Sequence, residues 1–254
     1  MKNILITGAT SGIGLATLKK FISPKDPSDN NSFVLAVGRN QKKLDEIKSQ
    51  FAKSVETFNY DLSNAADREK LFQEIKKREY ELDVVVNAAG ILRSGTIEDT
   101  TLDSWNETME INLNSVFHVM NLAIPFLEKR KGNIVNVSSV TGLRSFPNVL
   151  AYCVSKAAVD QLTRCASLEI APKGIRVNAV NPGVVITNIH KSSGMDEDSY
   201  QAFLEKSKTT HPIGRVGEPE EIADLIYFLS SEEAGWITGN TVSIDGGRNL
   251  TCAR

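Results

Sequence analysis

The stretch "NILITGATSGIG", residues 3–14, decides the fold of this chain. Its first five residues form a strand pattern that runs directly into a turn holding Gly8, Gly12 and Gly14, and a helical pattern follows over 12–22. Glycines at a strand-to-helix turn let the backbone approach a pyrophosphate, and the helix N-terminus offers unpaired N–H groups and a positive dipole end to the charge. The stretch therefore predicts a βα unit that binds a dinucleotide.

The same alternation of strand and helix patterns continues along the chain. Strand patterns occupy 3–7, 33–37, 55–59, 82–86, 133–137, 175–180 and 241–244. Helical patterns fall near 12–22, 40–52, 63–78, 103–130, 151–171 and 219–230. Parallel strands need crossover helices and read as continuous apolar runs. We therefore expect an α/β fold with a single Rossmann-like, doubly wound parallel sheet of about seven strands and helices on both faces.

The length and composition favour one domain. A chain of 254 residues, 41% hydrophobic and 24% charged, can bury a large core, so we expect a single dinucleotide-binding domain over 1–254. The polar segment 23–32 holds two prolines and is predicted to be an exposed loop. The segment 187–214 follows the sixth strand pattern, at the edge where open α/β sheets bind ligands, and is predicted to be a substrate lid.

The charge balance argues against partners that need a strongly charged surface. Lys and Arg total 29 against 31 Asp and Glu, and the net charge of -2 gives no general attraction to nucleic acid or anionic lipid. The sequence has no apolar run of membrane-spanning length and no Cys spacing typical of a metal site. Its three cysteines suit a reducing compartment. We therefore expect a soluble, cytoplasmic protein with a small-molecule substrate and no nucleic-acid, membrane or metal partner.

The end of the second strand pattern, "AVGRN" at 36–40, predicts which dinucleotide binds. A carboxylate at this point would bind a ribose 2′-hydroxyl, whereas an arginine would accept a 2′-phosphate. Gly38 has no carboxylate to repel a phosphate and Arg39 supplies a permanently charged planar fork, so NADP(H) is favoured over NAD(H). Asp61, directly after the third strand pattern, is predicted with equal weight to meet the adenine or to cap the next helix.

A second stretch, "AYCVSKAAV" at 151–159, places Tyr152 and Lys156 one helical turn apart. Taken alone, Tyr152 is better explained as a core aromatic with a satisfied hydroxyl, and Lys156 as a side chain whose stem runs along the surface to water. In a reactive site, a neighbouring ammonium would favour the phenolate of a tyrosine, whose free pKa is about 10.

Several motifs occur together and in order. They are "TGATSGIG" (7–14), "NAAG" (87–90), Asn112 in "MEINLNSVF", Ser139 in "IVNVSSV", "YCVSK" (152–156), "NPG" (181–183) with Thr187, and "GRVGEPEEIA", "ITG" and "DGG" near the C-terminus. They span nearly the whole chain. On these motifs the sequence resembles the short-chain dehydrogenase/reductase family, and within it the branch of 3-oxoacyl-carrier-protein reductases and related carbonyl reductases.

The resemblance implies four catalytic residues. Tyr152 would exchange a proton with the substrate oxygen, and Lys156 would lie beside it and reach the nicotinamide ribose hydroxyls. Ser139 would hydrogen-bond the substrate oxygen, and Asn112 would hold a water that links Lys156 to solvent.

The resemblance and the strand-end positions together imply a cofactor site. Its expected residues are Gly8, Thr10, Ser11, Gly12, Ile13, Gly14, Arg39, Asp61, Leu62, Asn87, Ala88, Ala89, Gly90, Tyr152, Lys156, Pro182, Gly183, Val185 and Thr187. Two positions depart from the common pattern. Ser11 stands where many NADP-preferring relatives have a basic residue, and Ala88 stands where a second Asn is common.

The function predicted in this way is NADP(H)-dependent reduction of a ketone or 3-oxoacyl group to the hydroxyl. An NAD-linked alcohol or hydroxysteroid dehydrogenase, and a non-catalytic dinucleotide sensor, remain as alternatives. The resemblance also implies a homotetramer, or a dimer, in which the helices near 103–130 and 151–171 pack against their symmetry mates.

Five further residues are expected near the mouth of the substrate pocket: Arg93, Arg144, Phe146, His190 and Met195. The basic ones could accept an acidic or phosphorylated carrier, although a solvated surface position is the preferred interpretation for each. No catalytic role is assigned to His190.

Overall fold

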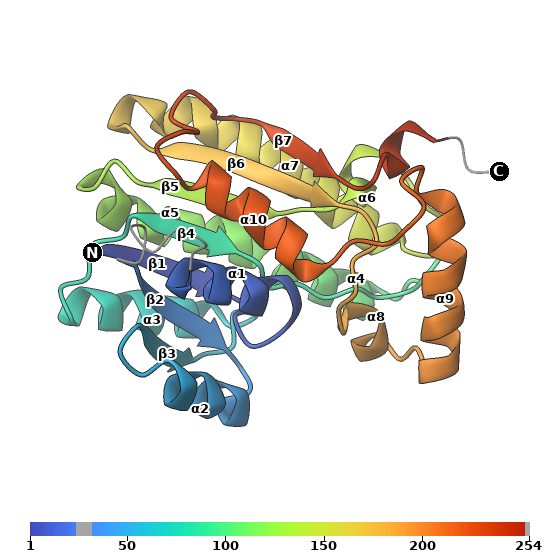
Figure 1. Cartoon of the computed structure of the whole chain (residues 1–254), viewed down its shortest axis with the longest axis horizontal. Coiled ribbons are helices and arrows are strands. Elements are labelled where there is room, and N and C mark those ends of the chain that lie inside the picture. The colour runs from blue at the N-terminus through green and yellow to red at the C-terminus, as the bar shows by residue number, and fades with distance from the viewer. Residues whose placement is uncertain (24–31, 252–254) are drawn as a thin grey trace.

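The computed structural model describes residues 1–23 and 32–251, and its centre is a seven-stranded sheet (Figure 1). The strands are β1 (Lys2–Thr7), β2 (Ser32–Gly38), β3 (Val55–Asn59), β4 (Val84–Asn87), β5 (Asn133–Val137), β6 (Arg176–Pro182) and β7 (Thr241–Ile244). Their order in the sheet is β3-β2-β1-β4-β5-β6-β7, and every neighbouring pair is parallel. The predicted doubly wound fold is confirmed.

The helices connect these strands in sequence. They are α1 (Gly12–Ile22), α2 (Gln41–Gln50), α3 (Ala65–Lys77), α4 (Leu102–Met109), α5 (Ser115–Glu128), α6 (Val140–Leu143), α7 (Leu150–Ile170), α8 (Ile189–Ser192), α9 (Glu197–Thr210) and α10 (Pro219–Leu229). Three short segments complete the set: the π-helical turn η2 (Glu110–Asn114), and the 3-10 turns η3 (Ala171–Lys173) and η4 (Arg248–Leu250).

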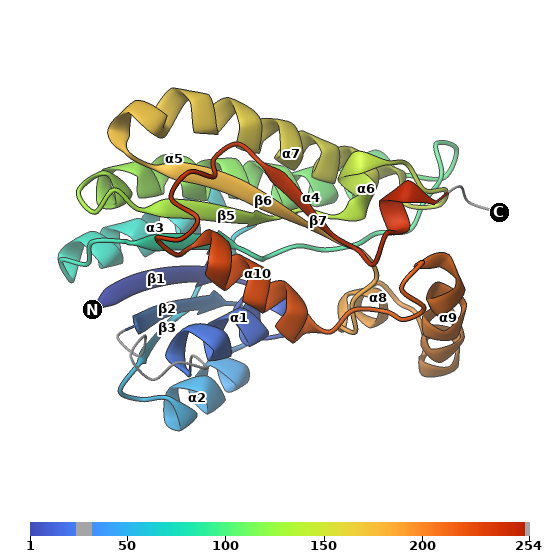
Figure 2. The ribbon, with the colours of Figure 1, turned by 45° about the horizontal axis from the view of Figure 1, so that its top comes forward.

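Helices cover both faces of the sheet, as Figure 2 shows. Successive strand residues point to opposite faces, so in β1 Leu5 packs under α3, α5 and α7, while Ile4 and Ile6 pack under α1, α2 and α10. All three side chains are fully buried. Because both faces are covered, the strands are continuous apolar runs, which is the pattern that allowed them to be found in the sequence.

The helix predicted over 103–130 is interrupted. The structure has α4, then the π-helical turn η2, then α5, and Asn112 lies in that turn. A single π turn adds a residue to the helix and is frequent at functional sites. The interruption coincides with polar side chains of η2 that bond outside the helix, because Glu110 pairs with Arg68 and Asn112 bonds Ile91.

The predicted loop at 23–32 and the predicted lid at 187–214 differ in what the structure describes of them. Most of the loop expected at 23–32 lies outside the described residues. The segment 187–214 contains two helices, α8 and α9, which stand beyond the carboxyl end of the sheet (Figures 1 and 2). Within residues 1–23 and 32–251, no helix combines the length and apolarity needed to cross a bilayer.

Candidate active site

A cavity of about 1290 Å³ opens at the carboxyl ends of the strands. Parallel α/β sheets bind ligands at this edge, where the strand order reverses between β1 and β4. The predicted site residues that line it are Gly8, Thr10, Ser11, Gly12, Ile13, Gly14, Arg39, Asp61, Leu62, Ala88, Ala89, Gly90, Ser139, Tyr152, Lys156, Pro182, Gly183, Val185 and Thr187. Asn87 and Asn112 are buried behind this surface, at 3% and 0% exposure.

The turn after β1 is built so closely that its glycines admit no side chain. Gly8 has φ +66°, and a Cβ there would lie 2.8 Å from the backbone nitrogen of Ala89. A Cβ on Gly14 would overlap the carbonyl of Gly8, and one on Gly12, at φ +49°, would lie 3.2 Å from Cγ2 of Thr187. The backbone is therefore exposed to the cavity at the start of α1, which is the cradle that a pyrophosphate needs.

Side-chain bonds fix the floor of this cradle. The hydroxyl of Thr7 accepts the backbone N–H groups of Ala88 (3.1 Å) and Ala89 (3.2 Å), which ties the end of β1 to the turn after β4. Asn87 donates through Nδ2 to Oδ1 of Asn136 at 2.9 Å. The side chain of Asn87 thus holds the neighbouring strand β5, and its predicted cofactor contact stays a prediction.

At the ends of β2 and β3, a cation and a carboxylate face each other. Arg39 Nη1 lies 3.8 Å from Asp61 Oδ2, and the Asp61 carboxylate also accepts the backbone N–H (3.0 Å) and hydroxyl (2.8 Å) of Ser63. Burial works to raise the pKa of Asp61, but the bonds from Ser63 and the charge of Arg39 outweigh it and hold that pKa below its ordinary value. Asp61 is therefore an anion that both shapes the turn before α3 and lines the cavity.

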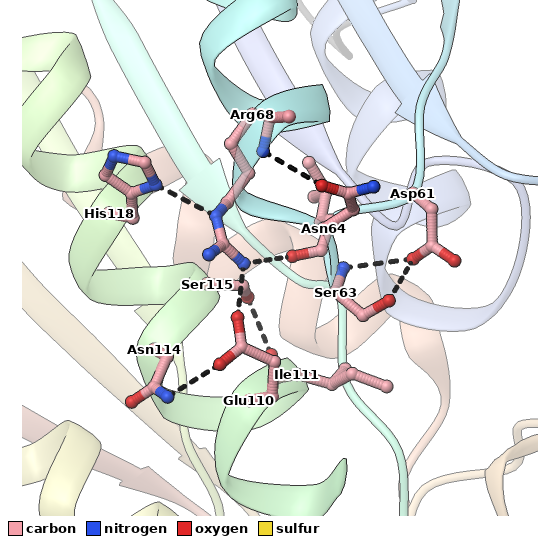
Figure 3. Close-up of polar contacts among 11 residues, drawn as sticks. Asp61, Ser63, Asn64, Arg68, Glu110, Ile111, Asn114, Ser115 and His118 are labelled. Carbon is pink, nitrogen blue, oxygen red and sulfur yellow. Dashed lines mark hydrogen bonds and ion pairs between the residues drawn. The ribbon is translucent and has the colours of Figure 1, made fainter.

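A buried guanidinium supports the same end of the cavity from behind (Figure 3). Arg68 on α3 donates from Nη1 to the carbonyl of Leu62 and to Oε1 of Glu110 (2.8 Å), and from Nε to Nδ1 of His118 (3.0 Å). Asn114 donates to the other oxygen of Glu110 at 2.7 Å. This cluster joins the turn after β3 to η2 and α5, and no signal in the sequence marked Arg68 for this role.

Ser139 and Tyr152 meet at the end of β5. Ser139 is the N-cap of α6, where its hydroxyl accepts the N–H of Thr141 at 3.2 Å, and it is hydrogen-bonded to the phenol of Tyr152 in the first turn of α7. Burial raises the pKa of Tyr152 to about 12, and the bond with Ser139 only partly opposes this. The phenol is therefore protonated at neutral pH.

That Lys156 favours the phenolate of Tyr152 stays a prediction, because burial is the main cause of the raised pKa of the phenol in the chain by itself. Lys156 Nζ lies 5.6 Å from the centre of the Tyr152 ring and donates to the carbonyl of Val137 at 2.8 Å. Burial lowers the pKa of Lys156 to about 8, while the charge of Asp160 works in the opposite direction. Burial is thus the first cause of the pKa shift of each of these two groups.

Asp160, one turn after Lys156 on α7, was not predicted and is fully buried. Its carboxylate accepts Nδ2 of Asn181 at 2.9 and 3.1 Å, and the same Nδ2 donates to the carbonyl of Ser139 at 2.9 Å. Burial raises the pKa of Asp160, against hydrogen bonds from Ser138 and Asn181 and the charges of Arg164 and Lys156. A charged residue four positions after Lys156 in an apolar helix was the available sequence signal.

Asn112 is committed to the backbone of Ile91. Its Oδ1 accepts the N–H of Ile91 and its Nδ2 donates to the carbonyl of Ile91, both at 2.9 Å, and Nδ2 also donates to Ser155 Oγ at 3.1 Å. The carboxamide therefore positions the turn that carries Gly90, and a Cβ added to Gly90 would lie 3.7 Å from Lys156 Nζ. The role of Asn112 in holding a water stays a prediction.

Residues of α9 and its C-cap hold the segment after β6 in place. His211 Nε2 accepts the N–H of Val184 at 3.1 Å, and a Cβ on Gly183 would lie 2.8 Å from that same nitrogen. The hydroxyl of Tyr200 donates to the carbonyl of Thr187 at 3.0 Å. Thr187 thus lies against Gly12 at the start of α1, and Tyr200 and His211 hold the segment after β6 in place.

The residues expected at the mouth divide into two groups. Arg93, Phe146 and His190 line the cavity. Arg144 instead donates to the carbonyls of Arg248, Asn249 and Thr251, and Met195 packs against Tyr200 and its apolar neighbours. Among the residues that the structure describes, no group of three or more His, Cys, Asp or Glu side chains could hold a metal ion.

Comparison with known proteins gives consistent matches over nearly the full length. A family profile described as Enoyl-(Acyl carrier protein) reductase matches residues 8–249. The chain is 35% identical to a 3-oxoacyl-acyl-carrier-protein reductase of Thermotoga maritima, covering 97% of both, and 31% identical to meso-2,3-butanediol dehydrogenase of Serratia marcescens, covering 97% and 94%. A cofactor-bound short-chain dehydrogenase/reductase of unknown function from Caenorhabditis elegans superposes with TM-score 0.90 at 32% identity, covering 99% and 96%.

Proposed function

Because the chain belongs to the short-chain dehydrogenase/reductase family, we propose that it reduces a ketone or 3-oxoacyl group to the hydroxyl with NADPH. Membership of the family makes it an oxidoreductase that interconverts C=O and CH–OH with a nicotinamide dinucleotide. The observation that carries the proposal is the hydrogen-bonded pair of Ser139 and Tyr152 at the cavity wall, with Lys156 one turn further along the same helix.

The residues of the cavity suit a bound dinucleotide. The glycine turn, with Thr10, Ser11 and Ile13, would hold the pyrophosphate at the start of α1, where the side chain of Ser11 makes no cap bond. Asp61 and Leu62 would adjoin the adenine. The turn at 87–90 would contact the ribose, and Pro182, Gly183, Val185 and Thr187 would clamp the nicotinamide. When bound, the nicotinamide ring supplies the hydride.

The chain itself supplies orientation and the proton. Ser139 donates a hydrogen bond to the substrate oxygen and holds it beside Tyr152, whose protonated phenol donates its proton to that oxygen as negative charge develops. The tyrosinate left behind is stabilised by the ammonium of Lys156, which is held by the carbonyl of Val137 and balanced by Asp160. In the alcohol-oxidising direction the same groups work in reverse.

Arg39 supports the choice of NADPH. Its side chain is exposed at the mouth of the cavity, directly after Gly38, and a guanidinium there can bind a 2′-phosphate through two parallel hydrogen bonds. The ion pair with Asp61 is the specific observation that favours the alternative, an NAD-linked dehydrogenase, because a carboxylate near the adenosine ribose disfavours a phosphate. Relatives named as meso-2,3-butanediol and 3beta-hydroxysteroid dehydrogenases fit that alternative.

We also propose that residues 1–254 form one catalytic domain whose lid is the segment 187–214, and that the chain assembles as a homotetramer or dimer. Residues from α8 and α9, among them His190 and Phe203, line the cavity, which supports the lid. Exposed apolar side chains on α5 and α7, Phe117 and Leu168, support packing against a second copy. Light scattering on the purified chain tests the assembly state.

Nicotinamide absorbance tests the reaction. With a short 3-oxoacyl thioester as substrate, NADPH should be consumed well above NADH, and the Tyr152→Phe variant should abolish consumption while still binding the dinucleotide. A preference for NADH would overturn the role of Arg39. Tight dinucleotide binding without turnover of any ketone or 3-oxoacyl compound would overturn the reductase proposal and favour a sensor.

A further inference from the structure

The substrate end of the cavity is lined by cations. Lys206 and Arg248 line it, and the one carboxylate among the lining residues that the structure describes is Asp61, beside Arg39. Arg93 also lines the cavity, toward Arg39, whose charge acts on the neighbouring Glu107. Arg93 is neutralised, because its Nε and Nη2 each donate to Glu107 at 2.9 Å. Lys206 and Arg248 therefore determine the charge at this end.

Arg248 is a cation held in one place. Its Nη1 donates to the carbonyl of Thr210, the last residue of α9, at 3.1 Å, and its guanidinium lies 5.1 Å from the centre of the Phe146 ring. The chain runs from Ser139 to Tyr152 through Phe146, and the carbonyl of Phe146 lies 3.8 Å from the thiol of Cys153. Arg248 is thus fixed against the loop that carries both proposed catalytic hydroxyls.

Among the residues that the structure describes, Arg248 forms no ion pair. The guanidinium of Arg144 lies 5.6 Å from the same Phe146 ring, so two cations share one aromatic side chain. Burial, and next the charge of Arg144, lower the pKa of Arg248, and Asp245 opposes them only partly. The Asp245 carboxylate accepts the N–H groups of Gly247 (3.0 Å) and Asn249 (2.7 Å), and within the described residues it forms no ion pair with Arg248.

Lys206 adds a second cation from the lid. It lies one turn before Thr210 on α9 and lines the cavity, and within the part of the chain that the structure describes it forms no ion pair. Its neighbour Lys208, by contrast, is paired with Glu205 at 2.5 Å. The side chain of Lys206 is exposed, so it can move toward a bound anion at the rim.

We propose that the carbonyl substrate carries an anionic group, a carboxylate or a phosphate, which binds to Arg248 with Lys206 at the rim. This inference deepens the proposed reductase function and depends on it for the reacting carbonyl. A guanidinium has five N–H donors, and its planar fork matches carboxylate and phosphate oxygens. An anion at this point relieves the repulsion between Arg144 and Arg248, whereas a neutral substrate leaves two cations beside a partly apolar cavity.

The experiment compares three substrates that share one reacting carbonyl. Acetoacetate carries a carboxylate, acetoacetyl-CoA carries phosphates at a distance, and ethyl acetoacetate is neutral. Steady-state reduction by the wild type is compared with Arg248→Gln, Arg248→Lys and Lys206→Gln. The matched control is Lys208→Gln, on the same helix and already paired with Glu205.

The wild type is expected to favour at least one anionic substrate over the ester. Arg248→Gln should lower that preference in kcat/KM by about tenfold or more, mainly through KM, because it removes a charge-assisted hydrogen bond. Arg248→Lys should restore part of it, Lys206→Gln should have a smaller effect, and Lys208→Gln should have none. A lower kcat/KM of Arg248→Gln for acetoacetate identifies a carboxylate as the bound anion. A lower kcat/KM for acetoacetyl-CoA alone identifies a phosphate.

Two results would overturn the inference. One is a wild type that reduces the ester as well as both anions, and the other is an Arg248→Gln variant with an unchanged preference. In either case ester turnover shows that the reductase function stands. If no carbonyl is reduced, the proposed function fails, and calorimetry with acetoacetate and the dinucleotide still decides the inference: binding that Arg248→Gln weakens supports it, and undetectable or unchanged binding overturns it.

Discussion

Arg39 Nη1 and Asp61 Oδ2 lie 3.8 Å apart, so the residue proposed to select NADPH is paired with a carboxylate. Both side chains are substantially exposed, which makes the pair weak and easily replaced by a phosphate. We expect Arg39→Gln to raise the KM for NADPH about 10- to 100-fold and to leave the KM for NADH nearly unchanged, since the bonds to the 2′-phosphate are lost. Steady-state kinetics with both dinucleotides measure this.

Lys42→Gln is the control for cofactor selectivity, because Lys42 is an exposed cation at the start of α2 and is absent from the cavity lining. It should change neither KM. Equal effects of Arg39→Gln on NADPH and NADH would contradict selection by Arg39.

Removing the phenol hydroxyl separates chemistry from binding. Tyr152→Phe should reduce kcat by about 10²- to 10⁴-fold, the usual contribution of a positioned acid, with little change in dinucleotide affinity measured by fluorescence titration. Ser139→Ala should also lower kcat. Because Ser139 additionally caps α6 through Thr141, that variant should lose about 1 kcal/mol of stability, whereas Tyr152→Phe should not. Residual turnover near the wild-type rate in Tyr152→Phe would remove Tyr152 from the mechanism.

Burial of Lys156 predicts a pH dependence of stability. Its pKa is about 8 in the folded chain and 10.5 ordinarily. Between these values the unfolded chain keeps a proton that the folded chain has released, so this group makes the free energy of unfolding rise with pH across that window. Below pH 8 the cost of the buried charge is present in full.

Lys156→Met should therefore stabilise the chain at pH 7, by roughly 2 kcal/mol, and the gain should vanish as pH approaches 10.5. Part of the gain is offset because Asp160 loses a neighbouring cation. Urea unfolding of both proteins at several pH values measures the difference. If Lys156→Met gains less stability over the wild type at pH 7 than at pH 10, the prediction is wrong.

Asp160 should act on the reaction through Lys156. Asp160→Asn removes the carboxylate that favours the ammonium, so the pKa of Lys156 should fall further and the loss of activity toward high pH should begin at lower pH. The amide can still accept from Asn181, which keeps Ser139 in place. A variant with lower kcat and an unshifted pH profile would show that Asp160 is only structural.

Sequence patterns predicted the sheet, the order of its elements and the cavity-lining turns, because each depends on local features: apolar runs, strand-to-helix glycines and helical spacing. The π turn at η2 was missed because the bonds that accompany it join distant residues, Asn112 with Ile91 and Glu110 with Arg68. The effect of burial on Tyr152, which raises the pKa of its phenol, was missed for a related reason. Its pKa depends on how much water the fold removes, which residue spacing does not reveal.

The buried guanidinium of Arg68 should be the main polar support of the adenine end. Arg68→Met leaves Glu110 without its cation and the carbonyl of Leu62 without its donor, so we expect a loss of about 3 kcal/mol in urea unfolding and a higher KM for the dinucleotide (Figure 3). Arg68→Lys should recover only part of this, because a single ammonium cannot replace a planar fork that also bonds His118. Lys70→Met, an exposed residue on the same helix whose partner Asp67 lies at 3.3 Å, should cost less than about 0.5 kcal/mol. If Arg68→Met costs no more than Lys70→Met, the cluster does not support the site.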